Sequence, residues 1–349
     1  MTISKIKKLF QNKFLNPYIL AEAGVNHECS MSNAIKMIDL ASQGGASGIK
    51  FQYYKAEKIA SVNSPAYWDT KKEKIKSQFE LFKKYDKFDY NNFKILKLHC
   101  LKKKIDFLCT PFDFKSAREL NSLVDVFKIS SSDITNKPFI EYISKFNKPI
   151  ILSTGASNLR EIKKALSWIA LPKKKIMLLH CILSYPTINA NANLGMIRDL
   201  QNNFPNIKIG YSDHTRPGNM KITNFAFVMG CCLVEKHFTF NKKIKGNDHY
   251  HSADKKDLIK LCKALKEVKI IMGSSKKKVI PAEKKSRIFA RRSIVAANFI
   301  AANKKIKITD LTFKRPGTGI EPFNLSKVVR KISKTNIKKD SLIKYDDFF

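Results

Sequence analysis

The sequence contains little arginine for so basic a chain. Lysine and arginine together number 66 against 29 acidic residues, giving a formal net charge of +37, yet only nine of the 66 are arginine. Proteins that bind nucleic-acid phosphates usually enrich arginine, because its planar guanidinium matches phosphate geometry. The lysines are instead spread along the whole chain. This pattern favours a solvated, lysine-biased surface over a nucleic-acid partner, although its positive field would also attract an anionic substrate.

The sequence also lacks any apolar run of membrane-spanning length, and its basic N-terminus has no continuous apolar segment of the secretory type. Its seven cysteines are an odd number, and no pair has zinc-finger spacing. We therefore expect a cytoplasmic protein with reduced cysteines and no membrane partner.

Eight short apolar segments alternate with longer amphipathic segments between Tyr18 and Met272. Their near-continuous apolar character predicts a parallel sheet covered by helices, and eight strand–helix repeats in roughly 250 residues predict a (β/α)8 TIM barrel. An open doubly wound sheet is the alternative, but no glycine-rich dinucleotide fingerprint follows the first segment. The predicted strands are Tyr18–Ala23, Gly48–Gln52, Asp106–Thr110, Val126–Ser130, Pro149–Ser153, Ile176–Cys181, Lys208–Ser212 and Leu233–His237.

Composition also predicts the domain organisation. Residues 1–272 are expected to form the α/β barrel, and the polar, lysine-rich stretch 273–287 a linker. Short alternating apolar runs in residues 288–349 predict a small second domain.

Reactive side chains collect at the predicted C-terminal ends of the strands, where TIM barrels place their active sites. Lys50 and Lys128, with hydroxyls from Ser131, Ser153 and Ser212, are the donors that one phosphate would need. A buried Lys128 would alternatively suit a Schiff base, as in an aldolase.

Two histidines follow adjacent strands. His214 and His237 are expected to hold one catalytic metal ion through imidazole nitrogens, with other coordination positions left open. For His99 and His180 we expect hydrogen-bonded core positions instead.

At these residues the sequence resembles the sialic acid synthase family. The resemblance runs in order over almost the whole chain, which makes coincidence a poor explanation. The matching segments are Ala21–His27, Lys50–Gln52, Cys109–Phe112, Phe127–Ser131, Leu152–Gly155, Tyr185–Thr187, Gly210–Thr215 and Glu235–Thr239, while Lys314–Gly319 resembles the signature of the family's C-terminal antifreeze-like domain, a β-clip or SAF fold.

The resemblance implies an N-acetylneuraminate synthase. Such an enzyme condenses phosphoenolpyruvate with an open-chain N-acetylated amino sugar, N-acetylmannosamine or a relative, and with water, to give a nine-carbon nonulosonate and phosphate. It also implies a domain-swapped homodimer, in which the antifreeze-like domain lends Arg315 to the partner's barrel. The implied roles are catalysis by Glu22, Lys50 and Tyr185, binding of phosphoenolpyruvate by Lys50, Lys128, Ser131, Ser153 and Ser212, binding of the sugar by Gln52, Tyr185, Asp248 and Arg315, and binding of Mn²⁺ or Mg²⁺ by His214 and His237.

The sequence departs from its relatives near the acceptor sugar. Ile182, Leu183 and Ser184 stand where relatives commonly carry polar residues, and no acidic residue follows in the run after Pro186. A less polar pocket favours a 2,4-diacetamido-trideoxyhexose, so a legionaminate or pseudaminate synthase is the alternative. A nucleic-acid-binding protein with an inactive barrel is a more distant one. His249 and His251 are expected in a surface loop, with additional substrate contacts as the alternative.

Overall fold

The computed structural model describes residues 3–13, 16–246 and 248–349, and the chain divides into two compact units, Met1–Gly273 and Ser274–Phe349. The strands of the first unit are β1 (Tyr18–Gly24), β2 (Gly48–Tyr53), β3 (Asp106–Pro111), β4 (Phe127–Ile129), β5 (Ile150–Ser153), β6 (Ile176–Cys181), β7 (Lys208–Asp213) and β8 (Leu233–His237). Its helices are α1 (Lys5–Phe10), α2 (Met31–Gln43), α3 (Ala56–Ile59), α4 (Gln78–Tyr85), α5 (Tyr90–Lys102), α6 (Phe114–Leu120), α7 (Lys137–Ser144), α8 (Leu159–Ser167), α9 (Gly195–Asn203), α10 (Lys221–Val228) and α11 (Lys255–Met272).

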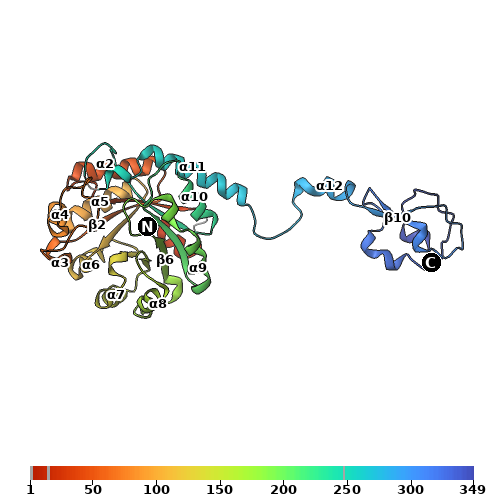
Figure 1. Ribbon diagram of the computed structural model, residues 1–349, viewed down its shortest axis with the longest axis horizontal. Coiled ribbons are helices and arrows are strands. Elements are labelled where there is room, and N and C mark those ends of the chain that lie inside the picture. The colour runs from red at the N-terminus through yellow and green to blue at the C-terminus, as the bar shows by residue number, and fades with distance from the viewer. Residues whose placement is uncertain (1–2, 14–15, 247) are drawn as a thin grey trace. The chain divides into compact units, whose positions relative to one another are not determined.

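The eight strands form one parallel sheet in the order β3-β2-β1-β8-β7-β6-β5-β4. The first and last strands in this order, β3 and β4, also contact each other, so the sheet closes on itself. Helices surround the strands as an outer layer (Figure 1). The predicted TIM barrel is therefore confirmed, and each strand lies within one residue of its expected bounds. Helix α6 is the helix expected between the third and fourth strands, whereas α1, α3 and α4 are additional to the eight strand–helix repeats.

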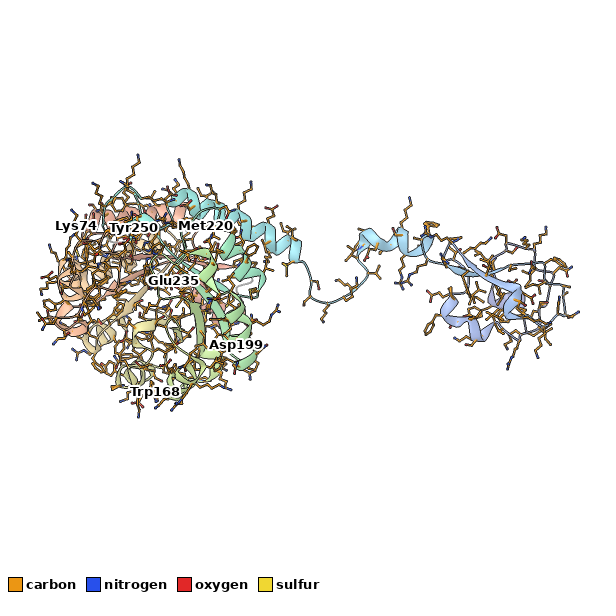
Figure 2. The ribbon with its side chains drawn as sticks, viewed as in Figure 1. Lys74, Trp168, Asp199, Met220, Glu235 and Tyr250 are labelled. Atoms are coloured by element: carbon orange, nitrogen blue, oxygen red, sulfur yellow. The ribbon has the colours of Figure 1, made fainter. Side chains whose placement is uncertain are left out.

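Strand alternation decides which side chains enter the barrel. In β8, Leu233 belongs to the apolar cluster inside the barrel, and Glu235 and His237 follow it at two-residue spacing. Lys236, between them, points the other way and pairs with Asp213 at 2.9 Å. Figure 2 shows Glu235 near the middle of the barrel unit. The same two-residue spacing brings Lys50 and Gln52 of β2 to the inner face.

Helix α1 closes the N-terminal end of the barrel. Its apolar residues Ile6, Leu9 and Phe10 are buried in the inner cluster against the first residues of the strands. Asp106, at the start of β3, accepts hydrogen bonds from the free backbone N–H groups of Lys5 and Ile6 (3.1 and 2.6 Å). Asp106 therefore caps the N-terminus of this six-residue helix, whose own N-cap residue, Ser4, makes no side-chain capping hydrogen bond.

The second unit has a small core of its own. Strands β9 (Ser293–Ala296) and β10 (Leu311–Lys314) pair antiparallel, and apolar residues around Ile294 and Ile343 are fully buried. A short helix, α12 (Lys284–Phe289), begins within the stretch predicted as a linker. In the described part of both units, no helix has the length and apolar character needed to cross a membrane.

Candidate active site

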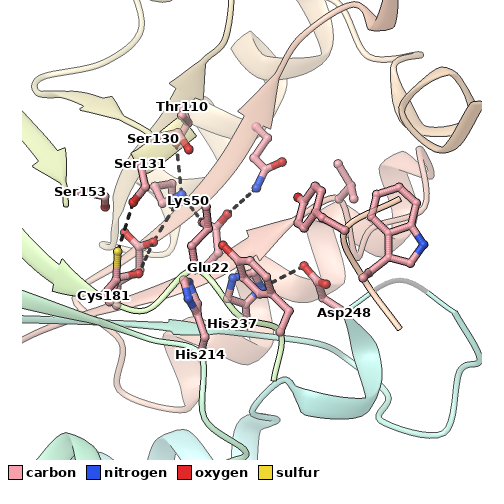
Figure 3. Close-up of a pocket in the computed structure, with 18 of the residues that line it drawn as sticks. Glu22, Lys50, Thr110, Ser130, Ser131, Ser153, Cys181, His214, His237 and Asp248 are labelled. Atoms are coloured by element: carbon pink, nitrogen blue, oxygen red, sulfur yellow. Dashed lines mark hydrogen bonds and ion pairs between the residues drawn. The ribbon is translucent and has the colours of Figure 1, made fainter. Parts of the chain in front are cut away.

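One cleft opens at the C-terminal ends of the barrel strands, with about 1070 Å³ of empty space (Figure 3). It gathers every site residue that the sequence predicts within the barrel: Glu22, Lys50, Gln52, Lys128, Ser131, Ser153, Tyr185, Ser212, His214, His237 and Asp248. The remaining predicted residue, Arg315, is exposed on the second unit just after β10.

Lys50 is the centre of a buried charge cluster. Its Nζ lies 2.6 Å from Glu22 Oε2 and 3.6 Å from Glu235 Oε1, and donates a hydrogen bond to Thr110 Oγ1 at 3.1 Å. Burial lowers the pKa of Lys50, but the two carboxylates outweigh it and the net shift is upward. Burial raises the pKa of Glu22 despite the opposing charge of Lys50. Gln52 donates to Glu22 Oε1 at 3.0 Å, which fixes the carboxylate's orientation.

Lys128 enters the cleft from β4, which is separated from β2 only by β3 in the closed barrel. Its Nζ donates to Ser153 Oγ at 2.6 Å, and burial lowers its pKa. Ser131 lies beside it, accepting a hydrogen bond from the backbone N–H of Gly155 at 2.9 Å. Two buried ammonium groups and several hydroxyls therefore face one space, an arrangement suited to an oxyanion.

Glu235 is a site residue to which the sequence analysis assigned no role. It is buried, and it accepts a hydrogen bond from Ser212 at 3.1 Å. The positive charges of Lys50 and Lys128 outweigh the effect of burial and lower the pKa of Glu235 to about 2. The sequence signal that could have identified it is its position two residues before His237 in a predicted strand, which puts both side chains on the same face.

His214 and His237 lie side by side in the cleft, with ring centroids 5.3 Å apart. His214 Nδ1 is 2.6 Å from the carbonyl oxygen of Ile182, so that nitrogen carries the proton and Nε2 keeps its lone pair. Burial lowers the pKa of His214 to about 3, which leaves it neutral at pH 7. A neutral, oriented imidazole of this kind fits a divalent ion.

Asp248 extends this group. Its Oδ2 lies 3.1 Å from His237 Nδ1, and the ligand atoms of His237, Asp248 and His251 all lie within 4.8 Å of one another. The expectation that His249 and His251 lie in a surface loop is wrong: both are at most 1 % exposed, within a 3-10 turn (His249–His251). Their loop folds inward because β8 ends beneath it, and Ala253 pairs with Phe238 just beyond the strand.

His99 and His180, for which hydrogen-bonded core positions were expected, are not among the described residues that line the cleft. The ring of His180 is buried against Tyr211 and is 2.9 Å from the carbonyl oxygen of Ala192. His99 pairs with Asp39 at 2.7 Å and is partly exposed. Both are hydrogen-bonded, and only His180 is fully buried.

Aromatic residues from the segment 61–77 form one wall of the cleft mouth, which the sequence did not predict. The ring of Tyr67 lies 6.5 Å from that of Tyr185 and 5.3 Å from that of Trp68. The segment is closed by backbone pairing of Pro65 with Ser77. Leu183 lies on the cleft wall as well.

The chain matches the NeuB family over residues 37–277 and the SAF domain over residues 291–348. It is 38% identical to the N,N'-diacetyllegionaminic acid synthase of Campylobacter jejuni, covering 93% of this chain and 98% of that one. It is 32% identical to the protein of the same name from Legionella pneumophila, covering 89% of each. Among solved structures, the N-acetylneuraminic acid synthetase of Leptospira borgpetersenii, in complex with citrate, is 33% identical with a TM-score of 0.68, over 78% of this chain and 90% of that one.

Proposed function

This chain belongs to the NeuB family, with a SAF domain at its C-terminal end, and we propose that it condenses phosphoenolpyruvate with an open-chain N-acetylated amino sugar to give a nonulosonate and phosphate. One observation carries the proposal: every site residue predicted in the barrel lines a single cleft at the C-terminal ends of the strands. These residues are distant from one another in the sequence, so their convergence is a property of the fold.

We propose a 2,4-diacetamido-trideoxyhexose as the acceptor, so that the product is a legionaminate. The sequence analysis placed N-acetylmannosamine first, but two close relatives named for diacetyllegionaminate support the alternative. Leu183 and Tyr67 add apolar surface to the cleft, which suits the methyl groups of such a sugar better than additional hydroxyls. Gln52, Tyr185 and Asp248 are the proposed polar contacts of the acceptor.

Phosphoenolpyruvate is proposed to bind between the two lysines. Lys50 and Lys128, with Ser131, Ser153 and Ser212, would donate to its phosphate and carboxylate oxygens. In the structure these groups already have partners within the chain: Lys50 pairs with Glu22, Lys128 with Ser153 and Ser212 with Glu235, while Ser131 Oγ lies 3.2 Å from Cys181 Sγ. These internal partners would hold the donor groups in place before the substrate arrives, and the substrate would then replace them.

His214 and His237 are the proposed holders of a divalent ion, Mn²⁺ or Mg²⁺. When bound, the ion would supply Lewis-acid polarisation of the acceptor's aldehyde. The chain itself orients both rings: Ile182 fixes the tautomer of His214, and Asp248 faces Nδ1 of His237.

The proposed reaction proceeds in two steps at these residues. C3 of phosphoenolpyruvate bonds to the aldehyde carbon, whose oxygen takes a proton and becomes a hydroxyl. Water adds at C2 and gives one proton to Glu22 Oε2, which balances the proton taken up by the aldehyde oxygen. The C2–O bond to phosphate then breaks, and the second proton of the water leaves with the phosphate as the ketone forms. Lys50 and Lys128 stabilise the charge that develops on the departing phosphate. Lys50, a charged ammonium 2.6 Å from Glu22, would stabilise the ionised form of that carboxylate, in which it can accept the proton.

Arg315 and the homodimer form the last part of the proposal. Arg315 is exposed on the second unit, available to another surface. We propose that the SAF domain of one protomer brings it to the acceptor end of its partner's cleft, where it would bind an acetamido group.

Phosphate release from phosphoenolpyruvate tests the function directly. Purified protein with Mn²⁺ would be given N-acetylmannosamine, the 2,4-diacetamido-trideoxy sugar or no sugar, with EDTA controls and mass spectrometry of products. A nine-carbon acid formed only with the diacetamido sugar and metal supports the whole proposal. A product only from N-acetylmannosamine refutes the acceptor, and no turnover by folded protein refutes the reaction.

The lowered pKa of Lys128 also suits a Schiff-base aldolase, which is the second candidate. Borohydride with pyruvate would then label Lys128 covalently, and EDTA would leave the activity intact. The synthase predicts the opposite result in both assays.

A further inference from the structure

His251 is a buried imidazole that none of the proposed steps uses. Its side chain is 1 % exposed, and neither ring nitrogen has a hydrogen-bond partner among the described residues. Leaving a buried polar group unpaired destabilises the folded state, because the group loses its hydrogen bonds to water. A chain that places histidine here therefore carries a penalty that a leucine or phenylalanine would avoid, and the position calls for a function.

The Asp248 carboxylate lies between two imidazoles. One oxygen, Oδ2, is 3.1 Å from His237 Nδ1, and the other, Oδ1, is 3.7 Å from His251 Nε2. The rings of His237 and His251 have centroids 5.4 Å apart. A shift of a few tenths of an ångström would bring His251 within hydrogen-bond distance of Asp248, since both belong to one short turn.

We propose that His251 is a positioning residue for the ion site: it holds Asp248 against Nδ1 of His237, and so aims the other nitrogen of His237 into the cleft. This inference rests on the proposed function, which places an ion at His214 and His237. Metal-binding histidines commonly donate their second ring N–H to a carboxylate, and removing such a partner typically weakens metal binding by about 10–100-fold. His251 acts one step further out, so its removal is expected to cost about tenfold.

Direct metal binding by His251 is the competing assignment, because its ligand atom lies within 4.8 Å of those of His237 and Asp248. Location favours the positioning role. His214, His237 and Asp248 line the cleft that substrates would enter, whereas His251 is not among the described residues that do. It lies behind the carboxylate.

The test measures ion binding rather than turnover. Mn²⁺ affinity would be determined from the EPR signal of free Mn²⁺ for the full-length protein and for His251→Ala and His251→Gln. The glutamine amide can reach the place of Nε2 and donate to Asp248. His249→Asn is the matched control, because His249 is equally buried in the same turn but hydrogen-bonds Thr239 Oγ1 through Nδ1, which asparagine can imitate. Thermal unfolding without metal checks that each variant folds.

We expect His251→Ala to weaken Mn²⁺ binding about tenfold, His251→Gln to restore most of it, and His249→Asn to leave it unchanged. The visible spectrum of the Co²⁺-loaded protein should keep its shape in His251→Ala. Unchanged Mn²⁺ affinity in a folded His251→Ala overturns the inference, and a changed Co²⁺ spectrum overturns it in favour of direct ligation. Wild-type protein that binds no Mn²⁺ overturns the proposed ion site as well, which distinguishes the two failures.

Discussion

Substitution of Gly155 by alanine should damage the phosphoenolpyruvate site without touching a charged residue. A Cβ at this position would lie 2.9 Å from Cys181 Sγ and 3.0 Å from Ser131 Oγ. Both distances are shorter than any comfortable contact between such atoms. Ser131 is a proposed ligand of phosphoenolpyruvate and already accepts a hydrogen bond from the Gly155 N–H. The added methyl group must therefore displace one of the two neighbours.

The magnitude follows from the crowding. Relieving both contacts requires movement of about half an ångström, and overpacking of this kind costs about 1–3 kcal/mol of folding stability. Misplacement of a positioning group by 1 Å can cost about 100-fold in rate. For half that movement we expect about a tenfold loss in kcat/KM for phosphoenolpyruvate, or about 1.4 kcal/mol.

Steady-state kinetics with saturating acceptor and varied phosphoenolpyruvate would measure this loss. Gly195→Ala is the control, because outside its chain neighbours and the backbone of its own helix no described atom lies within 4 Å of the added Cβ. Alanine at the start of α9 should be neutral or slightly stabilising. The double variant Gly155→Ala with Cys181→Ala removes the sulfur and should recover part of the loss. Urea unfolding of each variant separates a stability defect from a site defect.

Two results would refute the reasoning. Wild-type kinetics in Gly155→Ala would mean that the backbone at the strand ends relaxes around the added methyl group, or that binding of phosphoenolpyruvate does not depend on the position of Ser131. Equal losses in Gly155→Ala and in Gly195→Ala would mean that the crowding around Ser131 and Cys181 is irrelevant.

Three further predictions concern the fall in activity at low pH, the aromatic wall of the cleft at Tyr67, and helix α1, which closes the N-terminal end of the barrel. Burial raises the pKa of Glu22, and only the ionised carboxylate can accept a proton, so kcat/KM should fall as the pH drops through this raised pKa. Glu22→Gln should remove most of the activity, and the remaining activity should no longer show this fall at low pH. Tyr67→Ala should raise KM for the acceptor several-fold and leave KM for phosphoenolpyruvate unchanged in the same assay, whereas equal changes in both would contradict a wall that contacts only the sugar. Leu9→Ala should lower the free energy of unfolding by about 2–5 kcal/mol in urea titrations, and Ile3→Ala, which truncates an exposed side chain, should change it little.

Much of the barrel could be predicted because each strand carries its own signal. The strands are short apolar runs with reactive residues at or near their C-terminal ends, and the barrel fold makes those ends meet. This is why Lys50 of β2 and Lys128 of β4, distant in sequence, could be assigned to one site before any coordinates were known. Position along a strand was sufficient for these residues, without knowledge of side-chain contacts.

The rest could not be predicted because it depends on contacts between distant segments. Helix α1 carries only six residues, too few to be stable alone, and its cap is a carboxylate 100 residues away in Asp106. His251 was expected at the surface because its loop is polar, yet the loop folds over the end of β8. Local polarity predicts exposure only when no distant part of the chain packs against the segment.

The charge of the cleft is opposite to the charge of the chain, and this bears on how an anionic substrate would bind. Among the described residues that line the cleft are three lysines, at 50, 72 and 128, and five acidic residues, at 22, 69, 73, 235 and 248. The chain as a whole carries +37. A general positive surface can speed the approach of phosphoenolpyruvate, but it leaves the substrate facing a local excess of carboxylates. Binding a phosphate and a carboxylate there requires additional positive charge, which is the contribution expected of a divalent ion at His214 and His237.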